Sequence, residues 1–138
     1  MEEIEAQVRK FYSEIWNRKN YDEIPNVLHK DFIFRGSLGD EKQGHQDLRE
    51  YVEYIHSCLS DYKCHIEELV IQPGKVFAKM KFSGLHNAEF LGFTPTYHEI
   101  YWVGAALFNF SGDKVKSLWV LGDLKGLETQ LGETTSDE

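Results

Sequence analysis

The hydrophobic pattern of this chain changes period once, near residue 60, and that change limits the folds available to it. Before this point apolar residues recur every three or four positions, as they do over residues 4–16, which predicts helices that each bury one face. After it, apolar residues alternate with lysines over residues 76–82, which predicts half-buried antiparallel strands. Helices that precede and stay separate from an antiparallel sheet indicate an α+β fold.

The expected elements follow the same order along the chain, with three helices and one early strand before four consecutive strands. Asp22 is expected to cap the second helix, with Pro25 in its first turn. Because no repeat or linker divides the sequence, we expect a single domain over residues 1–132 and a disordered acidic tail over residues 133–138. The expected helices are residues 4–16, 22–28 and 45–58, and the expected strands are residues 32–34, 62–71, 76–82, 97–110 and 115–121.

Size and charge exclude several classes of partner. The chain has 138 residues, 41% of them hydrophobic and 14% aromatic, which is enough for one real core. Its formal net charge of -8 repels phosphate backbones and anionic lipids, so we expect neither nucleic acid nor a membrane as a partner. No secretory signal is recognised at the start, and Cys58 and Cys64 are expected to be buried thiols. These features predict a cytoplasmic protein.

Spacing gives no support for a metal, a cofactor or a covalent nucleophile. The histidines form no i, i+4 pair around a glutamate, and there is no C-x-x-C motif, so no metal site is expected. The loop over residues 36–44 carries Asp40 and Glu41, which would repel a phosphate. It is expected to be a flexible connector or a lid over a cavity mouth. Arg35 at its base could hold an anionic substrate group or form a surface ion pair.

Asp123, at the end of the last expected strand, is the candidate for acid/base chemistry. By alternation Asp123 faces the same way as Trp119 and Leu121, and an apolar cavity on that face would raise its pKa. The alternative is a solvated residue that caps the following turn, residues 124–131. Asp123 lies opposite Tyr101 if residue 110 pairs with residue 114, or opposite Trp102 if residue 111 does.

Two further groups of residues could belong to the same site. His86 shares the apolar face of its strand, where it is either a hydrogen-bonded core residue or a second catalytic group. Large aromatic residues could line a pocket for a flat apolar ligand, although the same spacing also suits core packing. These aromatic residues are Tyr12, Trp16, Trp102 and Trp119, and Arg35 and His45 are added to them as substrate-binding candidates.

Two stretches of the sequence resemble a known family. Residues 86–96, HNAEFLGFTPT, are similar to a histidine, glycine and Pro-Thr run, and residues 123–132 match the closing signature D-x-x-G…Q-L-G. Together they resemble the SnoaL-like polyketide cyclases within the nuclear transport factor 2 and ketosteroid isomerase superfamily. The resemblance implies a cone-shaped fold, with three N-terminal helices packed on a curved, mostly antiparallel sheet that encloses a pocket.

The resemblance also implies a chemistry. In the cyclases the signature aspartate, here Asp123, is the acid/base of a cofactor-free intramolecular aldol condensation. Residues 103–106 read Val-Gly-Ala-Ala where the cyclases place a polar histidine, which leaves fewer groups to stabilise an enolate. The first hypothesis is a cyclase, isomerase or lyase that acts on a small hydrophobic carbonyl compound, with His86 as a hydrogen-bonding group. The alternatives are a binding module without turnover and a structural dimer; a homodimer is expected in each case.

Overall fold

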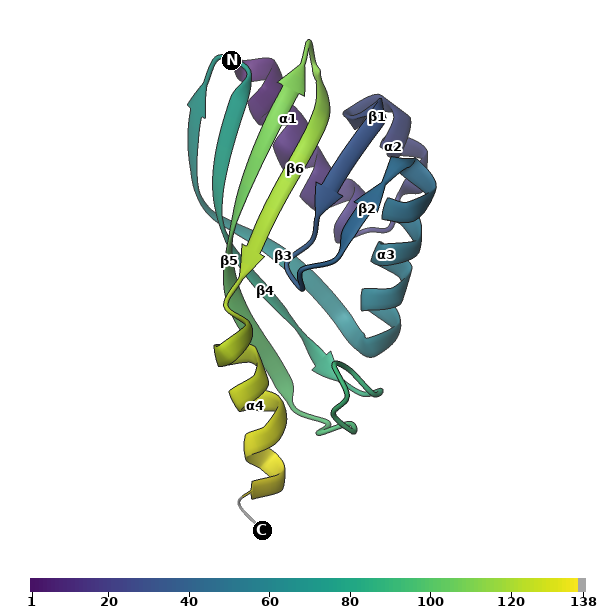
Figure 1. Ribbon diagram of the computed structural model, residues 1–138, viewed down its shortest axis with the longest axis vertical. Helices are drawn as coiled ribbons and strands as arrows, with labels where there is room; N and C mark the ends of the chain where they lie inside the picture. The colour runs from purple at the N-terminus through teal and green to yellow at the C-terminus, as the bar shows by residue number, and fades with distance from the viewer. Residues whose placement is uncertain (137–138) are drawn as a thin grey trace.

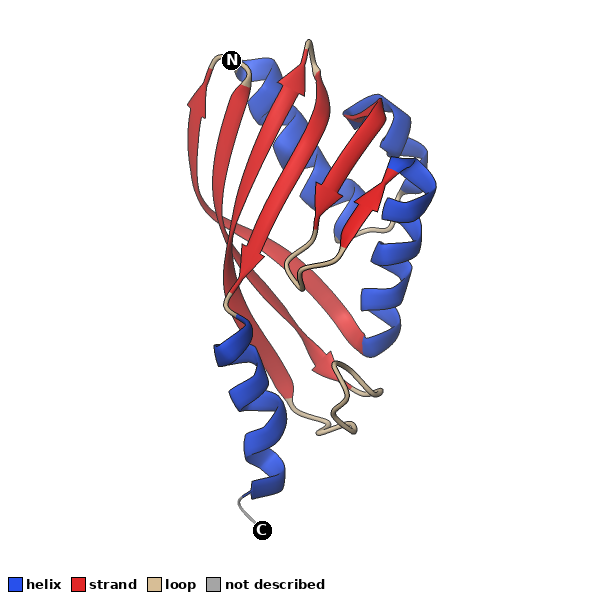
Figure 2. Ribbon diagram, in the orientation of Figure 1, coloured by secondary structure: helices blue, strands red, loops and turns tan. Residues whose placement is uncertain are grey.

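The computed structural model describes the backbone of residues 1–136 and the side chains of residues 1–132. Within these residues the strands form one six-stranded sheet in the order β2-β1-β6-β5-β4-β3. Figures 1 and 2 show this sheet as a strongly curved surface, with helices packed against its inner side and one helix beyond its far end. The α+β expectation is therefore confirmed, and the sheet is mixed because one pair of strands is parallel.

The N-terminal helix changes its winding halfway along. Helix α1, Glu2–Lys10, continues without a break into η1, Phe11–Trp16, which is wound as a π-helix. The apolar stripe of both parts is buried against the sheet, and Ile15 has no exposed surface. The predicted helix over residues 4–16 is thus confirmed, with a wider turn at the aromatic end that sequence periodicity does not reveal.

The second predicted helix is shorter than expected. A 3₁₀ turn, η2, Tyr21–Glu23, leads into α2, Ile24–Val27, with Pro25 in its first turn. Asp22 lies inside the 3₁₀ turn, so the expected N-cap role of Asp22 is wrong. Helix α3, Gly44–Cys58, agrees with the prediction for residues 45–58 and buries the expected stripe, including Leu48 and Tyr51.

Most strands extend the predicted ones at both ends, but the strand expected over residues 97–110 begins two residues later and ends one residue later, as Glu99–Ser111. Strand β1, Leu28–Arg35, pairs antiparallel with β2, Glu41–Gln43, a short strand that the prediction left inside a loop. Strand β1 also pairs in parallel with β6. The four remaining strands form consecutive antiparallel pairs: β3, Leu59–Gln72; β4, Lys75–His86; β5, Glu99–Ser111; and β6, Lys114–Gly122.

A β-bulge sets the register of the last hairpin. Ser111 pairs with Lys114 and Phe110 with Val115, but Asn109 pairs with Ser117. Strand β6 therefore holds one extra residue, Lys116, which has no partner in β5. Gly104 consequently pairs with Gly122, and the Asp123 amide donates a hydrogen bond to the Val103 carbonyl at 2.9 Å. Both expected positions for Asp123, opposite Tyr101 or Trp102, are wrong because a bulge shifts every later pair by one residue.

The last described element is a helix that lies along the part of β5 that β6 leaves unpaired. Helix α4, Leu124–Ser136, buries Leu127 and Leu131 completely. Its backbone includes residues 133–136, whereas residues 137 and 138 lie outside the described part, so the expected disordered tail over 133–138 remains a prediction, as does the single domain over 1–132. Among residues 1–136, no helix has the length and apolarity needed to cross a membrane.

Candidate functional site

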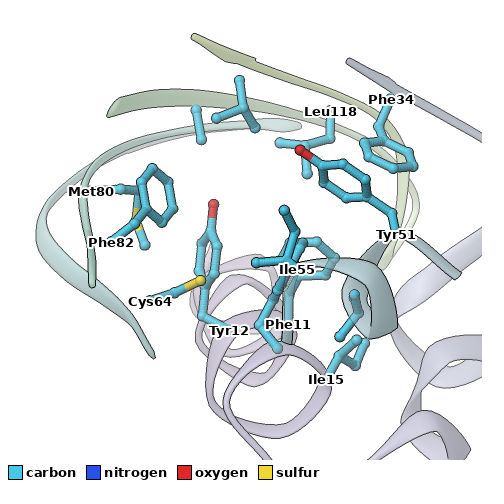
Figure 3. Packing of buried hydrophobic residues seen from close by; sticks show 14 of the residues in the cluster. Phe11, Tyr12, Ile15, Phe34, Tyr51, Ile55, Cys64, Met80, Phe82 and Leu118 are labelled. Atoms are coloured by element: carbon cyan, nitrogen blue, oxygen red, sulfur yellow. The ribbon is translucent and has the colours of Figure 1, made fainter. Parts of the chain in front are cut away.

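The interior of the cone holds a small cavity between η1, α3 and the concave face of the sheet. Its free volume is about 30 Å³, and its walls are mostly apolar side chains, with four rings that have polar ends, one thiol, and Gly36 and Ser37. Figure 3 shows Tyr12 rising from η1 and Tyr51 entering from α3, with both hydroxyl groups pointing into the space below the sheet. The polar-ended rings and the thiol belong to Tyr12, Trp16, Tyr51, Tyr62 and Cys64.

Two hydroxyl groups at this cavity lack a hydrogen-bond partner among the described atoms. The Tyr12 hydroxyl is completely buried. The Tyr51 hydroxyl lies close to the Ser37 side chain and the Leu38 backbone, which lower its pKa against the larger effect of burial, as hydrogen-bonding groups do, although neither contact has full hydrogen-bond geometry. The third phenol, Tyr62, accepts a weak hydrogen bond from the Cys64 thiol at 3.7 Å. A buried hydroxyl without a partner costs about 1–3 kcal/mol, so Tyr12 and Tyr51 are unusual features of a folded core.

Burial keeps the ionisable groups of the cavity neutral. It raises the pKa of Tyr12 and of Tyr62 well above the ordinary value, and it raises the pKa of Tyr51 to about 12. Burial also raises the pKa of the Cys64 thiol. No carboxylate or imidazole is among the described residues that line the cavity. The site can therefore donate hydrogen bonds at neutral pH, but its own lining offers no group that accepts a proton from carbon.

Gly36 makes room for the Tyr51 hydroxyl. A Cβ atom at Gly36 would lie 2.7 Å from the hydroxyl oxygen and 2.8 Å from the ring carbon that bears it. The Tyr51 ring packs edge-on against Trp16 and tilted against Phe34, with centroid distances of 5.7 and 5.5 Å. The position of Tyr51 thus depends on a glycine at the end of β1 and on two neighbouring rings.

Asp123 does not line this cavity. Its side chain shares the face of Trp119 and Leu121, as predicted, but that face is the outer one, where both residues are nearly half exposed. The Asp123 Oδ1 atom accepts a hydrogen bond from the Gly126 amide at 3.1 Å, which caps the first turn of α4. This is the alternative that the sequence left open, a solvated residue that caps the next turn.

His86 is a buried residue that holds a loop. Its Nδ1 atom accepts a hydrogen bond from the Thr96 amide at 3.1 Å, and its ring packs 6.4 Å from Phe90. Burial lowers the pKa of His86, while the nearby carbonyls of Phe93 and Ala88 oppose that shift. His86 is not part of the cavity wall, so the geometry agrees with the hydrogen-bonded core residue that the sequence offered as one alternative.

The predicted binding residues divide into two groups. Tyr12 and Trp16 line the cavity, whereas Trp102 does not line it but packs against a lining residue, with its ring centroid 5.4 Å from that of Phe82. Trp119 is not a cavity wall, because it projects from the outer face with 45% of its surface exposed. The sequence missed Tyr51 as a site residue, although a polar-ended ring on the buried stripe of a helix was an available signal.

Arg35 and His45 also lie away from the cavity. The Arg35 guanidinium stacks over Trp119 on the outer face and donates a hydrogen bond to the Val120 carbonyl at 2.6 Å. The His45 ring is hydrogen-bonded to the His29 carbonyl at 2.9 Å. Neither residue lines the cavity, because each is turned toward backbone oxygens elsewhere. Across the described residues, no three His, Cys, Asp or Glu side chains lie close enough together to hold a metal ion.

Solved structures with this architecture are numerous. TsrD from Streptomyces laurentii is 21% identical, with a TM-score of 0.83, and the match covers 94% of this chain and 95% of that one. A SnoaL-like polyketide cyclase from Agrobacterium tumefaciens is 17% identical, with a TM-score of 0.80 and coverage of 94% and 98%. AclR from Streptomyces galilaeus, described as a candidate hydroxylase, is 21% identical, with a TM-score of 0.81 and coverage of 96% and 98%. At these identities the likeness establishes the fold alone.

Sequence comparison gives the family. No curated protein matches the chain. The family model described as SnoaL-like polyketide cyclase matches residues 6–131, which include η1, α3, the whole sheet and most of α4. The match therefore covers every element that forms the cavity, together with the closing signature up to Leu131. This chain belongs to the SnoaL-like polyketide cyclase family.

Proposed function

We propose that this protein binds a small, mostly apolar molecule in its interior cavity, with an uncharged acceptor oxygen such as a carbonyl between Tyr12 and Tyr51. The observation that carries this proposal is the pair of buried hydroxyls without partners, which face a hollow whose other walls are largely apolar. A ligand oxygen that accepts hydrogen bonds from both phenols would satisfy them. Because neither phenol ionises near neutral pH, both remain donors.

The size of the cavity restricts how such a ligand is bound. A free volume of about 30 Å³ corresponds to about one water molecule, whereas a benzene ring needs a cavity of about 150 Å³. A ligand of ring size therefore requires one wall to move. Tyr51 is the natural choice, because it is the donor that also borders a groove at the surface. Outward movement of its ring would join the two spaces.

A matched pair of ligands tests this proposal. We expect acetophenone, which has a carbonyl acceptor, to bind about three- to tenfold more tightly than ethylbenzene in an NMR titration, because each hydrogen bond contributes about 0.5–1.5 kcal/mol. Tyr12→Phe and Tyr51→Phe should each reduce that preference, whereas Tyr97→Phe, at a residue that is 69% exposed, should leave it unchanged. Equal binding of both ligands by the unmodified protein would refute the role of the phenols.

A second proposal is enzymatic, and it rests on Asp123 in the family signature. In this proposal the protein is a cofactor-free cyclase, isomerase or lyase for a hydrophobic carbonyl compound, with Asp123 as the acid/base and His86 as a hydrogen-bonding group. The Asp123 carboxylate would have to leave the α4 cap and turn inward during the reaction. The test is turnover of an identified substrate: Asp123→Asn should abolish it, whereas a pure binding protein returns its ligand unchanged.

We propose that the protein forms a homodimer through the outer face of the sheet. Half-exposed apolar side chains on neighbouring strands there include Val103, Trp119 and Leu121. Apolar groups gathered on one face of a monomer are typical of an interaction surface. Sedimentation velocity should give a dimer that Leu121→Asp converts to a monomer.

We also propose a reducing compartment such as the cytoplasm, because Cys58 and Cys64 are both free and buried.

A further inference from the structure

The side chain of Asn17, the residue that follows η1, is bonded to the backbone of the last strand of the sheet. Among the described strands β3 is at the end of the sheet, so one of its edges has no neighbouring strand. Asn17 Oδ1 accepts a hydrogen bond from the Cys64 amide at 2.7 Å, and Asn17 Nδ2 donates one to the Cys64 carbonyl at 3.0 Å. A residue of a further strand would offer Cys64 the same acceptor and donor, so the Asn17 amide replaces one residue of such a strand.

The backbone of Asn17 completes the winding of η1. Its amide donates a hydrogen bond to the Tyr12 carbonyl at 2.8 Å, which is an i→i+5 bond of the π-helix. π-Helical winding is rare, and it occurs mostly as single turns within α-helices. The two side-chain bonds from Asn17 to Cys64 therefore hold the turn that begins at Tyr12 from outside the helix.

Both residues that Asn17 connects belong to the cavity. Tyr12 and Cys64 line it, and Figure 3 shows their side chains close together. Burial and, to a smaller extent, the Cys64 thiol raise the pKa of Tyr12, which agrees with this close approach. The Tyr12 hydroxyl has no hydrogen-bond partner among the described atoms, so its position depends on the backbone that carries the ring. Asn17 does not line the cavity, yet it fixes that backbone relative to β3.

We propose that Asn17 is a positioning residue of this site: it ties the end of η1 to β3 and so holds the Tyr12 phenol where one ligand oxygen accepts hydrogen bonds from Tyr12 and Tyr51. The proposal rests on the proposed binding function and adds a residue that controls its specificity. Hydrogen bonds weaken steeply when donor and acceptor are misaligned, so two phenols serve one oxygen only while both are held in place. A hydrocarbon ligand has no such requirement.

Asn17→Asp tests the connection with almost no change in volume. At neutral pH the new carboxylate accepts the bond from the Cys64 amide but turns an oxygen, in place of the NH₂ group, toward the Cys64 carbonyl. In the unmodified protein, acetophenone should bind about three- to tenfold more tightly than ethylbenzene, and in Asn17→Asp this preference should fall below about twofold. The affinity for ethylbenzene should not change.

A pH profile separates the lost hydrogen bond from general damage to the fold. A protonated carboxyl has one donor and one acceptor, as an amide does. The carbonyl that faces it and its partial burial should raise the pKa of the new carboxyl above the usual value of about 3.9. In Asn17→Asp the ketone preference should therefore return at about pH 4, whereas the unmodified protein should show it at both pH values.

A control variant and a measurement without ligand complete the test. Asn26→Asp makes the same change at an exposed asparagine whose side chain bonds to Glu23, and it should keep the ketone preference at both pH values. Without ligand, Asn17→Asp at neutral pH should shift the ring NMR signals of Tyr12 and leave those of the exposed Tyr97 in place.

Each result decides between the two proposals. An unchanged ketone preference in Asn17→Asp, unchanged Tyr12 signals, or a preference that does not return in acid would overturn the positioning role. Loss of binding of both ligands would also overturn it, because Asn17 would then hold the fold as a whole. If the unmodified protein shows no preference for the ketone while the Tyr12 signals respond as expected, the proposed binding function is wrong and the role of Asn17 in placing Tyr12 stands.

Discussion

The cavity and the sheet end at α4 use their polar residues in opposite ways. In the cavity the polar ends of Tyr12 and Tyr51 are buried and have no partner among the described atoms. At the sheet end, the accessible side chains of Asp123 and Gln130 are hydrogen-bonded to backbone groups. Tyr12 and Tyr51, which the sequence pattern assigns to core packing, thus have hydroxyl groups without partners. Asp123 and Gln130 of the family signature instead form hydrogen bonds with backbone groups.

The signature at residues 123–132 can be explained by structure alone. Asp123 caps α4, and a Cβ at Gly126 would lie 2.5 Å from the Asp123 Oδ2 atom, so a larger residue there would displace the capping carboxylate. The Gln130 side chain accepts a hydrogen bond from the Tyr101 amide at 2.9 Å and donates one to the Tyr101 carbonyl at 2.5 Å. Gln130 therefore substitutes for the strand that β5 lacks beyond Gly104. A sequence signature in this fold is thus not by itself a sign of chemistry.

The largest expected effect concerns the attachment of α4. Leu127→Ala should lower the free energy of unfolding by about 2–5 kcal/mol, because it removes a fully buried leucine side chain. Urea denaturation measures the change. Glu128→Ala, at an exposed position of the same helix, is the control and should have little effect. A small loss in Leu127→Ala would mean that α4 is not packed as described, and would remove the structural explanation of the signature.

Gln130→Ala should lower the free energy of unfolding by less, about 1–2 kcal/mol. In this variant two backbone hydrogen bonds of Tyr101 are replaced by bonds to water. Amide hydrogen exchange at Tyr101 should speed up in this variant, and exchange within the β3–β4 pair should not change. If the Tyr101 amide keeps its protection in Gln130→Ala, the substitute-strand role of Gln130 is wrong.

Two substitutions at Asp123 distinguish its helix-capping role from a role of its negative charge. Asp123→Ala should lower the free energy of unfolding by about 1 kcal/mol, because the α4 cap is lost. Asp123→Asn should lower it by less than about 0.5 kcal/mol, because asparagine caps helices equally well. Thermal unfolding compares the two variants. A large loss in Asp123→Asn would show that the negative charge itself matters at this position, which the capping role does not require.

The smallest effect is a pH dependence due to His86. Its pKa is lowered in the folded protein by burial, so the unfolded chain binds the proton more readily. The contribution of His86 is complete above its unfolded pKa of about 6.5 and declines as the pH falls below that value. His86→Asn should flatten the decline of stability between about pH 6.5 and 5, and His65→Asn, at an exposed position, should not. A decline that persists in His86→Asn would point to His56, whose pKa burial also lowers.

Much of the fold was predictable because hydrophobic periodicity records which face of an element is buried. The stripe of α3 and the alternation of β4 are both reproduced by the structure. The position of Asp123 was not predictable, because one extra residue, Lys116, forms a bulge and moves every later pair of the hairpin. Nothing in the composition of residues 114–117 distinguishes a bulge from a regular strand.

The site was harder to predict than the fold for a physical reason. Periodicity placed Tyr12, Trp16 and Tyr51 on buried faces, but burial does not reveal whether a hydroxyl finds a partner. That depends on the residues that meet at the centre of the cone from η1, α3 and the sheet, and on the room that Gly36 leaves. Trp119 lies on the outer face rather than at the cavity, and the sequence could not show this, because alternation identifies which residues share a face but not which face is concave.

The most direct test of the account is where an aryl ketone binds. In a methyl-detected NMR titration with acetophenone, we expect chemical-shift changes at Leu48, Ile55 and Leu118, whose side chains line the cavity. The methyl groups of Leu121 and Leu124, which flank Asp123 in the sequence, should not move. Changes at Leu121 and Leu124 with unchanged signals from the cavity would contradict the account and return the functional site to Asp123.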